Sequence, residues 1–345
     1  MLFIMKRLCF IILAFIVYQL PSAQPSLINR KLFFSDDKII EVTLTTDIKK
    51  LLTQKKLSAW QPASITMQLS DTSVISEVIN VKPRGIYRKE YCNMASLMLD
   101  FKNPAAPRLS PLKKLKLVGG CTNAKADEEL LLKEYLVYKI FSFISPMGFR
   151  VRLLHINYND SKQKVRSYSQ YAFLIEDIKD LAARNNCKEK RNTVFGLDDA
   201  DRQQFNLVCL FQYMIGNTDW SVRQYHNIKL MVPKNDTLAR PYVVPYDFDY
   251  AGLVDAPYAV PNEGLGITSV TERLYRGFAR NMDELQANLN ILKEKKDKII
   301  SFITDFPLLN VKVKRNMIMY LEEFYEIIDD KKSIRSVFIT NARNN

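Results

Sequence analysis

The sequence predicts an α+β chain of two lobes, with a β-rich first lobe and a helical second lobe. Short alternating segments rich in β-branched residues fill the first part of the chain, and apolar residues at helical spacing fill the second. The pattern changes near residue 177. With 345 residues, 47% of them hydrophobic, the chain is long enough for this arrangement. We expect residues 24–176 to form the β-rich lobe and residues 177–345 the helical lobe.

The first 23 residues are expected to be a signal peptide. Lys6 and Arg7 make a short basic start, residues 8–18 are an apolar run, and small residues end at Ala23. An uncleaved anchor is the alternative, although a spanning helix needs roughly 20 apolar residues. Cleavage near Ala23 would release an exported protein, periplasmic or extracellular. No later run reaches spanning length, so we expect the mature chain not to span a membrane.

The β-rich lobe is predicted from segments that alternate or are rich in β-branched residues. These segments are 39–45, 65–69, 78–82, 97–101, 114–118, 151–158 and 168–175. A turn is expected at Arg84-Gly85, and a short helix at residues 47–57. One longer helix is expected from Asp127 to Ile144, because the helical spacing ends at Pro146-Met147-Gly148.

The second lobe is predicted to be mostly helical, with two short strands. Its apolar residues recur at helical spacing over three segments, which are 198–215, 283–306 and 313–329. Asp199 and Asp201 lie near the start of the first of these helices, where the helix dipole favours acids. The two strands are expected at 228–232 and 242–246.

Cysteine and histidine usage limits the kinds of site that the chain can build. Four cysteines remain after residue 23, and an even number in an exported chain permits disulfides. Cys92 and Cys121 flank one strand-rich region and are candidates to pair, whereas Cys209 lies in an apolar helical segment typical of a buried thiol. The two histidines, His155 and His226, and the absence of a Cys-x-x-Cys argue against a zinc site.

The net charge of +13 falls to +11 when Lys6 and Arg7 leave with the signal peptide. A basic chain favours anionic surfaces or acidic substrates, and a lysine-rich solvated surface is the alternative interpretation. No nucleic-acid-binding module is recognisable, so we expect no nucleic-acid partner.

Candidate metal ligands concentrate in one segment of the second lobe. Asp219 follows a helix end, Asn227 precedes a predicted strand, and Asp247 follows the next strand in a Pro-Tyr-Asp-Phe-Asp sequence that ends at Asp249. A hairpin of the two strands brings Asn227 and Asp247 to the end where Asp219 enters. Carboxylate and amide oxygens with phosphate and water suit Mg²⁺, and Asp219 is then free to orient or deprotonate a hydroxyl.

Each of these residues also has a purely structural interpretation. Asn-Thr-Asp favours turns without catalysis, so Asp219 can be a turn residue. Asp247 and Asp249 can be solvated acids at a strand end, although they bracket an apolar residue. His226 is expected to order the loop rather than to transfer a proton.

The segment Asn217-Thr218-Asp219…Asn227…Asp247-Phe248-Asp249 resembles the catalytic segment of atypical kinases of the spore-coat CotH type. Arg84-Gly85 and the run Tyr171–Asp177 resemble an early Arg-Gly segment and the strand that leads into the hinge in that family. The similarity covers about residues 75–280. The resemblance implies a two-lobed atypical kinase-like fold, with Asp219 catalytic, Asn227, Asp247 and Asp249 binding metal, and Glu176 at the nucleotide site. The chain also looks like uncharacterised exported bacterial proteins.

The chain departs from ordinary kinases at three places. No Gly-rich phosphate loop is visible, as is also true of CotH-type domains, and Asn217-Thr218 stands in place of His-Arg. The gap from Asp219 to Asn227 is longer than the roughly five residues of ordinary kinases, so the loop must bulge. For the nucleotide-binding lysine we select Lys116, paired with Glu134 on the following helix. The alternative is that Lys116, like Lys114, faces solvent.

These observations predict an exported kinase that uses Mg²⁺ or Mn²⁺ and ATP, or another nucleotide, to phosphorylate a protein or glycan hydroxyl. One alternative is a non-catalytic kinase-like scaffold for surface binding or envelope assembly. The other is metal-dependent hydrolysis at the same acids, which usually involves more histidines. The sequence does not identify the acceptor.

Overall fold

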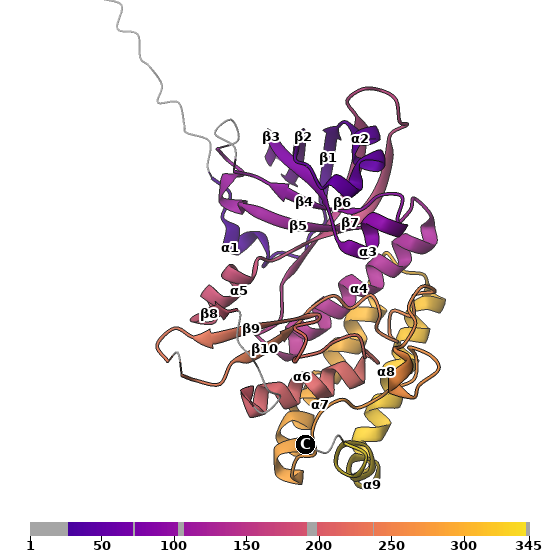
Figure 1. Ribbon diagram of the computed structural model, residues 1–345. Helices are drawn as coiled ribbons and strands as arrows, with labels where there is room; N and C mark the ends of the chain where they lie inside the picture. Colours follow the sequence, from indigo (N-terminus) through magenta and orange to yellow (C-terminus); the bar gives the residue numbers. More distant parts are fainter. Residues whose placement is uncertain (1–26, 72, 103–106, 192–198, 237, 343–345) are drawn as a thin grey trace, which may run out of the picture.

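The computed structural model describes residues 27–71, 73–102, 107–191, 199–236 and 238–342. Figure 1 shows a β-barrel at one end of the molecule and a group of helices at the other, with a small sheet at the side between them. We call the two parts the barrel lobe (β1–β7) and the helical lobe (α5–α9). The α+β class and the order of the two lobes agree with the prediction from sequence.

Seven strands close the barrel in the order β1-β2-β3-β4-β5-β7-β6. Their bounds are β1 Ile40–Thr46, β2 Gln61–Ser70, β3 Ser73–Arg84, β4 Ser96–Asp100, β5 Lys114–Gly119, β6 Val151–Asp160 and β7 Tyr168–Ile175. Neighbouring strands are antiparallel except β1 and β6, whose parallel pairing, Leu44 opposite Tyr158, closes the barrel. Every second residue of β1 is buried, so the alternation in the sequence corresponds to the inside and outside of the barrel.

The described part of the barrel lobe also contains three short α-helices, and one long helix joins this lobe to the helical lobe. The short ones are α1 Arg30–Phe33, α2 Ile48–Thr53 and α3 Ile86–Tyr91. Where a turn was predicted, Gly85 has φ 84° and leads directly into α3. The long helix α4, Lys125–Ile144, packs against β6 and β7 and also against α7. It therefore connects the cores of the two lobes.

The helical lobe contains a three-stranded sheet in the order β10-β9-β8 beside its helices. The strands are β8 Cys187–Lys190, β9 Ile228–Pro233 and β10 Tyr242–Pro245; the helices are α5 Ile178–Arg184, α6 Arg202–Met214, α7 Met282–Thr304, α8 Val311–Asp329 and α9 Lys331–Arg335. The predicted helices and strands of this lobe are confirmed to within a few residues. β8 was not predicted, because its sequence, Cys-Lys-Glu-Lys, has no β-branched residue.

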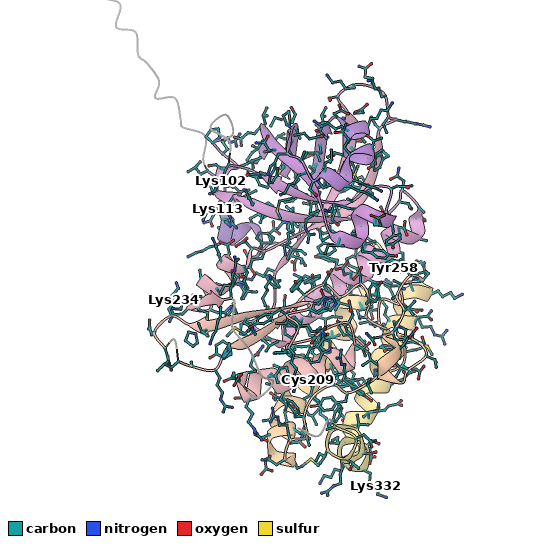
Figure 2. All side chains as sticks on the ribbon, in the orientation of Figure 1. Lys102, Lys113, Cys209, Lys234, Tyr258 and Lys332 are labelled. Atoms are coloured by element: carbon teal, nitrogen blue, oxygen red, sulfur yellow. A yellow bond between two sulfur atoms is a disulfide. The ribbon has the colours of Figure 1, made fainter. Side chains whose placement is uncertain are left out.

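The cysteines divide as the sequence suggested. Cys92 and Cys121 form a disulfide that joins the end of α3 to the segment after β5. Cys187 and Cys209 are buried thiols, and Figure 2 shows Cys209 within the helical half of the molecule. No helix in the described part of the chain has the length and apolarity needed to cross a membrane. The predicted signal peptide lies outside the described residues.

Candidate active site

A cavity of about 450 Å³ is lined by residues of both lobes. The helical lobe contributes Asp219, Asn227, Asp247 and Asp249, which are the four acids and amides singled out in the sequence. The barrel lobe contributes several residues around the end of β3 and the start of α3. Arg84, Arg88 and Tyr87 are among them. The cavity therefore places negative groups of one lobe opposite positive groups of the other.

Asn217 anchors the loop that carries Asp219. Its side chain is buried and donates to Gln212 Oε1 over 3.0 Å, while its Oδ1 accepts from the Asp219 backbone N–H over 3.0 Å. Its carbonyl accepts from Trp220 Nε1 over 3.1 Å. These bonds fix the backbone on both sides of Asp219, so the loop is held by buried polar contacts rather than by solvent.

The long gap between Asp219 and Asn227 is closed by a small hairpin. Ser221 and His226 exchange two backbone hydrogen bonds of 2.9 and 3.0 Å. His226 Nε2 then lies 2.8 Å from Asp219 Oδ1, and Asn227 Nδ2 lies 2.8 Å from Asp219 Oδ2. The predicted bulge thus brings Asn227 back to Asp219. Because its amide nitrogen is used there, its amide oxygen is the atom available to a ligand.

Phe248 positions the two carboxylates of Asp-Phe-Asp. Its ring is 0% exposed and lies 4.7 Å from the ring of Tyr138 on α4 and 5.7 Å from that of Phe211 on α6. Asp247 has φ 65°, a conformation that Asp tolerates better than most residues, and its backbone N–H donates to Tyr138 Oη over 2.8 Å. The buried ring therefore holds Asp247 and Asp249 at the cavity wall.

Arg88 is the cation that Glu134 contacts. Its guanidinium lies 3.8 Å from Glu134 and 4.0 Å from Asp249, whose carboxylate also accepts from Tyr258 Oη over 3.1 Å. Figure 2 labels Tyr258 at the level where the two lobes meet. The predicted pairing of Lys116 with Glu134 is therefore wrong, because Glu134 forms its ion pair with Arg88 on α3 instead.

Burial and crowding of negative charge shift the two carboxyl groups beside Arg88. Glu134 is 1% exposed, and burial raises its pKa well above the ordinary value, with Asp249 and Asp247 adding to the effect. Burial and the charge of Asp247 raise the pKa of Asp249 to about 6. Both shifts favour the protonated, neutral forms of these carboxyl groups.

Lys116 is not among the residues that line this cavity, but it belongs to a group of cations with Arg84, which does line it. Burial, Arg84 and Lys229 lower its pKa to about 8, whereas Asp247 opposes that change. The ammonium groups of Lys116 and Lys229 lie 5.2 and 5.6 Å from the ring centre of Tyr246. Within the described residues none of the three cations has a carboxylate within 4.0 Å. Such a cluster is arranged for an anionic ligand.

Glu176 is not among the cavity residues. Its carboxylate lies 3.0 Å from Arg184 Nε and accepts from the Arg150 backbone N–H over 3.1 Å. It stands between β7 and α5, where the chain passes from one lobe to the other. The side chain therefore stabilises this connection, and we find no support for its assignment to a nucleotide.

Three residues of the site were missed in the sequence. Arg88, Tyr138 and Tyr258 contact the acids from distant parts of the chain. Arg88 was visible only as one of several basic residues after Arg84-Gly85, with nothing to indicate its partners.

The donor set around Asp247 fits a hard divalent cation. Asp247, Asp249 and Asn227 line one cavity, and burial followed by the charge of Asp247 raises the pKa of Asp249. No group of three or more His, Cys, Asp or Glu with metal-binding geometry occurs in the described part of the chain. A cation would therefore complete its shell with Asn227, water and ligand oxygens, as Mg²⁺ commonly does.

Comparisons with known proteins do not identify the function of this site, so the functional assignment rests on its geometry. No protein-family model matches the sequence, and no curated protein is significantly similar to it. The fold is similar to the crystal structure of the Helicobacter pylori proinflammatory kinase CtkA, with a TM-score of 0.40 and 12% sequence identity over 70% of this chain and 94% of that chain. This likeness is too weak to carry an argument, and it leaves the CotH type without support.

Proposed function

We propose that the protein is an exported atypical kinase that transfers a phosphoryl group from ATP, or another nucleotide, to a protein or glycan hydroxyl. The observation that carries the proposal is the convergence of Asp219, Asn227 and Asp247 on one cavity between the lobes. Phosphoryl transfer needs positioning and charge stabilisation, and a base, metal ligands and phosphate-binding cations provide these.

Asp219 is the group proposed to orient the acceptor hydroxyl. His226 and Asn227 hold its two carboxylate oxygens at 2.8 Å each, so the side chain has one orientation toward the cavity. A fixed carboxylate accepts the hydroxyl proton as the new bond to phosphorus forms. His226 is thereby a positioning residue, in agreement with its expected role in ordering the loop.

Asn227, Asp247 and Asp249 are the residues proposed to hold Mg²⁺ or Mn²⁺. When bound, such a cation bridges phosphate oxygens and neutralises the charge that develops during transfer. Asp247 is exposed, and its side chain makes no hydrogen bond within the described residues, whereas the Asp249 carboxylate contacts Arg88 and Tyr258. Asp247 is therefore the stronger candidate for direct coordination.

Arg84 and Lys116 are proposed to bind the nucleotide phosphates. Burial lowers the pKa of Arg84, and burial with neighbouring cations lowers that of Lys116. An anion between them would offset this repulsion, which is the physical reason to expect a phosphate there.

We expect Asp247→Asn to abolish measurable binding of Mg²⁺-ATP in isothermal titration of the mature chain. The change keeps the size of the side chain and removes its charge, so the metal loses its main ligand. Asp297→Asn, on an exposed turn of α7, is the matched control and should bind as the native chain does.

Two results of this titration would contradict the proposal. Absence of nucleotide affinity in the native chain would favour the scaffold, and affinity untouched by Asp247→Asn would remove the metal site. Incubation with nucleotide distinguishes hydrolysis from transfer. Release of free phosphate without labelling of an acceptor would indicate a hydrolase.

The affinity for Mg²⁺-ATP should fall as the pH rises through about 8. The pKa of Lys116 is lowered to about 8 in the free protein. Above this pH the side chain loses its proton and therefore its attraction for phosphate. Titration from pH 7 to pH 9 measures the decline. Lys116→Arg keeps the charge throughout and should flatten the profile, whereas an unchanged decline in this variant would show that another group is responsible.

A further inference from the structure

We propose that a second cavity, where α6 and α7 begin, binds a small oxyanion, either a phosphate or a carboxylate group. This cavity has a volume of about 370 Å³ and is lined by Arg280, Asn288, Arg202 and Glu284, among others. It shares no lining residue with the cavity of the proposed active site. A volume of this size suits a small organic anion.

Arg280 is the residue that requires a ligand. It is 8% exposed, yet in the described structure it makes no hydrogen bond or ion pair; its guanidinium lies 5.9 Å from the ring centre of Phe278. Its nitrogens are not among the fully buried polar atoms, so a ligand in the cavity that Arg280 lines can reach them. A planar guanidinium that lines a cavity is suited to bind a carboxylate or phosphate with two parallel hydrogen bonds.

The start of α7 adds positive character to the same place. Arg280 directly precedes the N-cap Asn281 of this 23-residue helix. The Asn281 side chain accepts from the backbone N–H of Glu284, whereas the N–H groups of Met282 and Asp283 have no acceptor within the described residues. Helix N-termini with free N–H groups favour anions, and here the helix end and Arg280 coincide.

The acids at this cavity form no ion pair with Arg280 in the described part of the chain, although the charge of Arg280 contributes a little to the lowered pKa of Glu284. Glu284 is bound by Arg202 through two hydrogen bonds, one of them of 3.0 Å, and the bond to Arg202 is the main reason that the pKa of Glu284 lies below its ordinary value. Asp283 is exposed in the first turn of α7 and makes no ion pair within the described residues. The pairing of Arg202 with Glu284 therefore leaves Arg280 as the unbalanced charge.

Asn288 indicates what else the ligand carries. It is 1% exposed; its Nδ2 donates to the Gln203 carbonyl over 3.1 Å, but its Oδ1 has no hydrogen-bond partner among the described residues. An unsatisfied buried acceptor costs free energy that a donor would recover. A hydroxyl or ammonium group beside the anionic group, as in a hydroxy acid or a small phosphate ester, would supply one.

The test is isothermal titration of the mature chain with inorganic phosphate and, separately, with acetate. We expect saturable binding of at least one of them, and at least a tenfold loss of its affinity in Arg280→Met. The preferred ion distinguishes a phosphate source from a carboxylate source. Arg166→Met, at an exposed position, is the matched control, and Lys116→Met should retain this binding because Lys116 is not among the residues that line this cavity.

A second measurement separates binding from a structural role of Arg280. Because Met removes an unpaired buried charge, Arg280→Met should unfold at a denaturant concentration equal to or above that of the native chain without added anion. Phosphate or acetate should stabilise the native chain and not the variant. Equal affinities of the native chain and Arg280→Met, binding of neither ion, or a less stable variant without anion would overturn the proposal. Nucleotide binding at the active cavity is unaffected by any of these results.

Discussion

Asp219→Asn is expected to reduce phosphoryl transfer about 10²–10⁴-fold, which is the usual contribution of a positioned general base. The amide keeps the shape of the side chain but no longer accepts the hydroxyl proton. Its hydrogen-bond partners, His226 and Asn227, lie 2.8 Å away and stay in place. Affinity for Mg²⁺-ATP should change little, because the proposed metal ligands all remain and the amide oxygen of the new residue can still accept from Asn227.

The measurement is transfer of labelled γ-phosphate in single turnover, to the protein itself or to a candidate acceptor. Titration of the same samples with Mg²⁺-ATP separates binding from chemistry. Asp297→Asn serves again as the control for loss of one carboxylate. Transfer that survives in Asp219→Asn would refute its catalytic role, and a parallel loss of nucleotide affinity would place Asp219 among the metal ligands instead.

Arg88→Met should lower the free energy of unfolding by about 3–5 kcal/mol, the usual cost of breaking a buried ion pair. Glu134 is 1% exposed, and Arg88 is its cationic contact at 3.8 Å and that of Asp249 at 4.0 Å. Without Arg88, the negative charges of Glu134 and Asp249 lose the cation that offsets their mutual repulsion. The loss should shrink as the pH falls, because the pKa values of both groups are already raised and protonated carboxyls need no cation.

Chemical denaturation of the mature chain at several pH values measures this effect. The double variant Arg88→Met/Glu134→Met should recover much of the lost stability, because it removes both charges rather than one. Arg166→Met, which lies exposed on the barrel, should stay within about 0.5 kcal/mol of the native chain. Equal losses in Arg88→Met and in the double variant would show that Arg88 acts without Glu134.

Most secondary structure was predictable because its signals are local. α4 was expected from Asp127 to Ile144 and begins two residues earlier, at Lys125. α7 and α8 follow the apolar spacing and are capped by Asn281 and Asn310. β8 escaped prediction because it is formed by pairing with β9 and not by its own propensity.

The candidate site was predictable in part. Asp219, Asn227 and Asp247 were identified from their order, and the structure gathers them at one cavity. The partners of the charged residues were not predictable. Lys116 was paired with Glu134 because a strand lysine and a glutamate on the following helix pair in kinases. In the structure Arg88, which lies on α3, forms the ion pair with Glu134 instead. Glu176 was assigned to the nucleotide, yet Arg184 holds it at the connection between the lobes.

The sequence by itself predicted most of the helices and strands, the candidate pair Cys92 and Cys121, and the acids that can serve one site. These properties depend on periodicity and on residues near one another in the chain. The tertiary structure alone decided that β1 pairs with β6 to close a barrel, that Arg88 contacts Glu134 and Asp249, and that Arg280 is buried without an ion pair to any described residue. Such contacts join distant segments, and packing selects one partner among many residues of suitable charge.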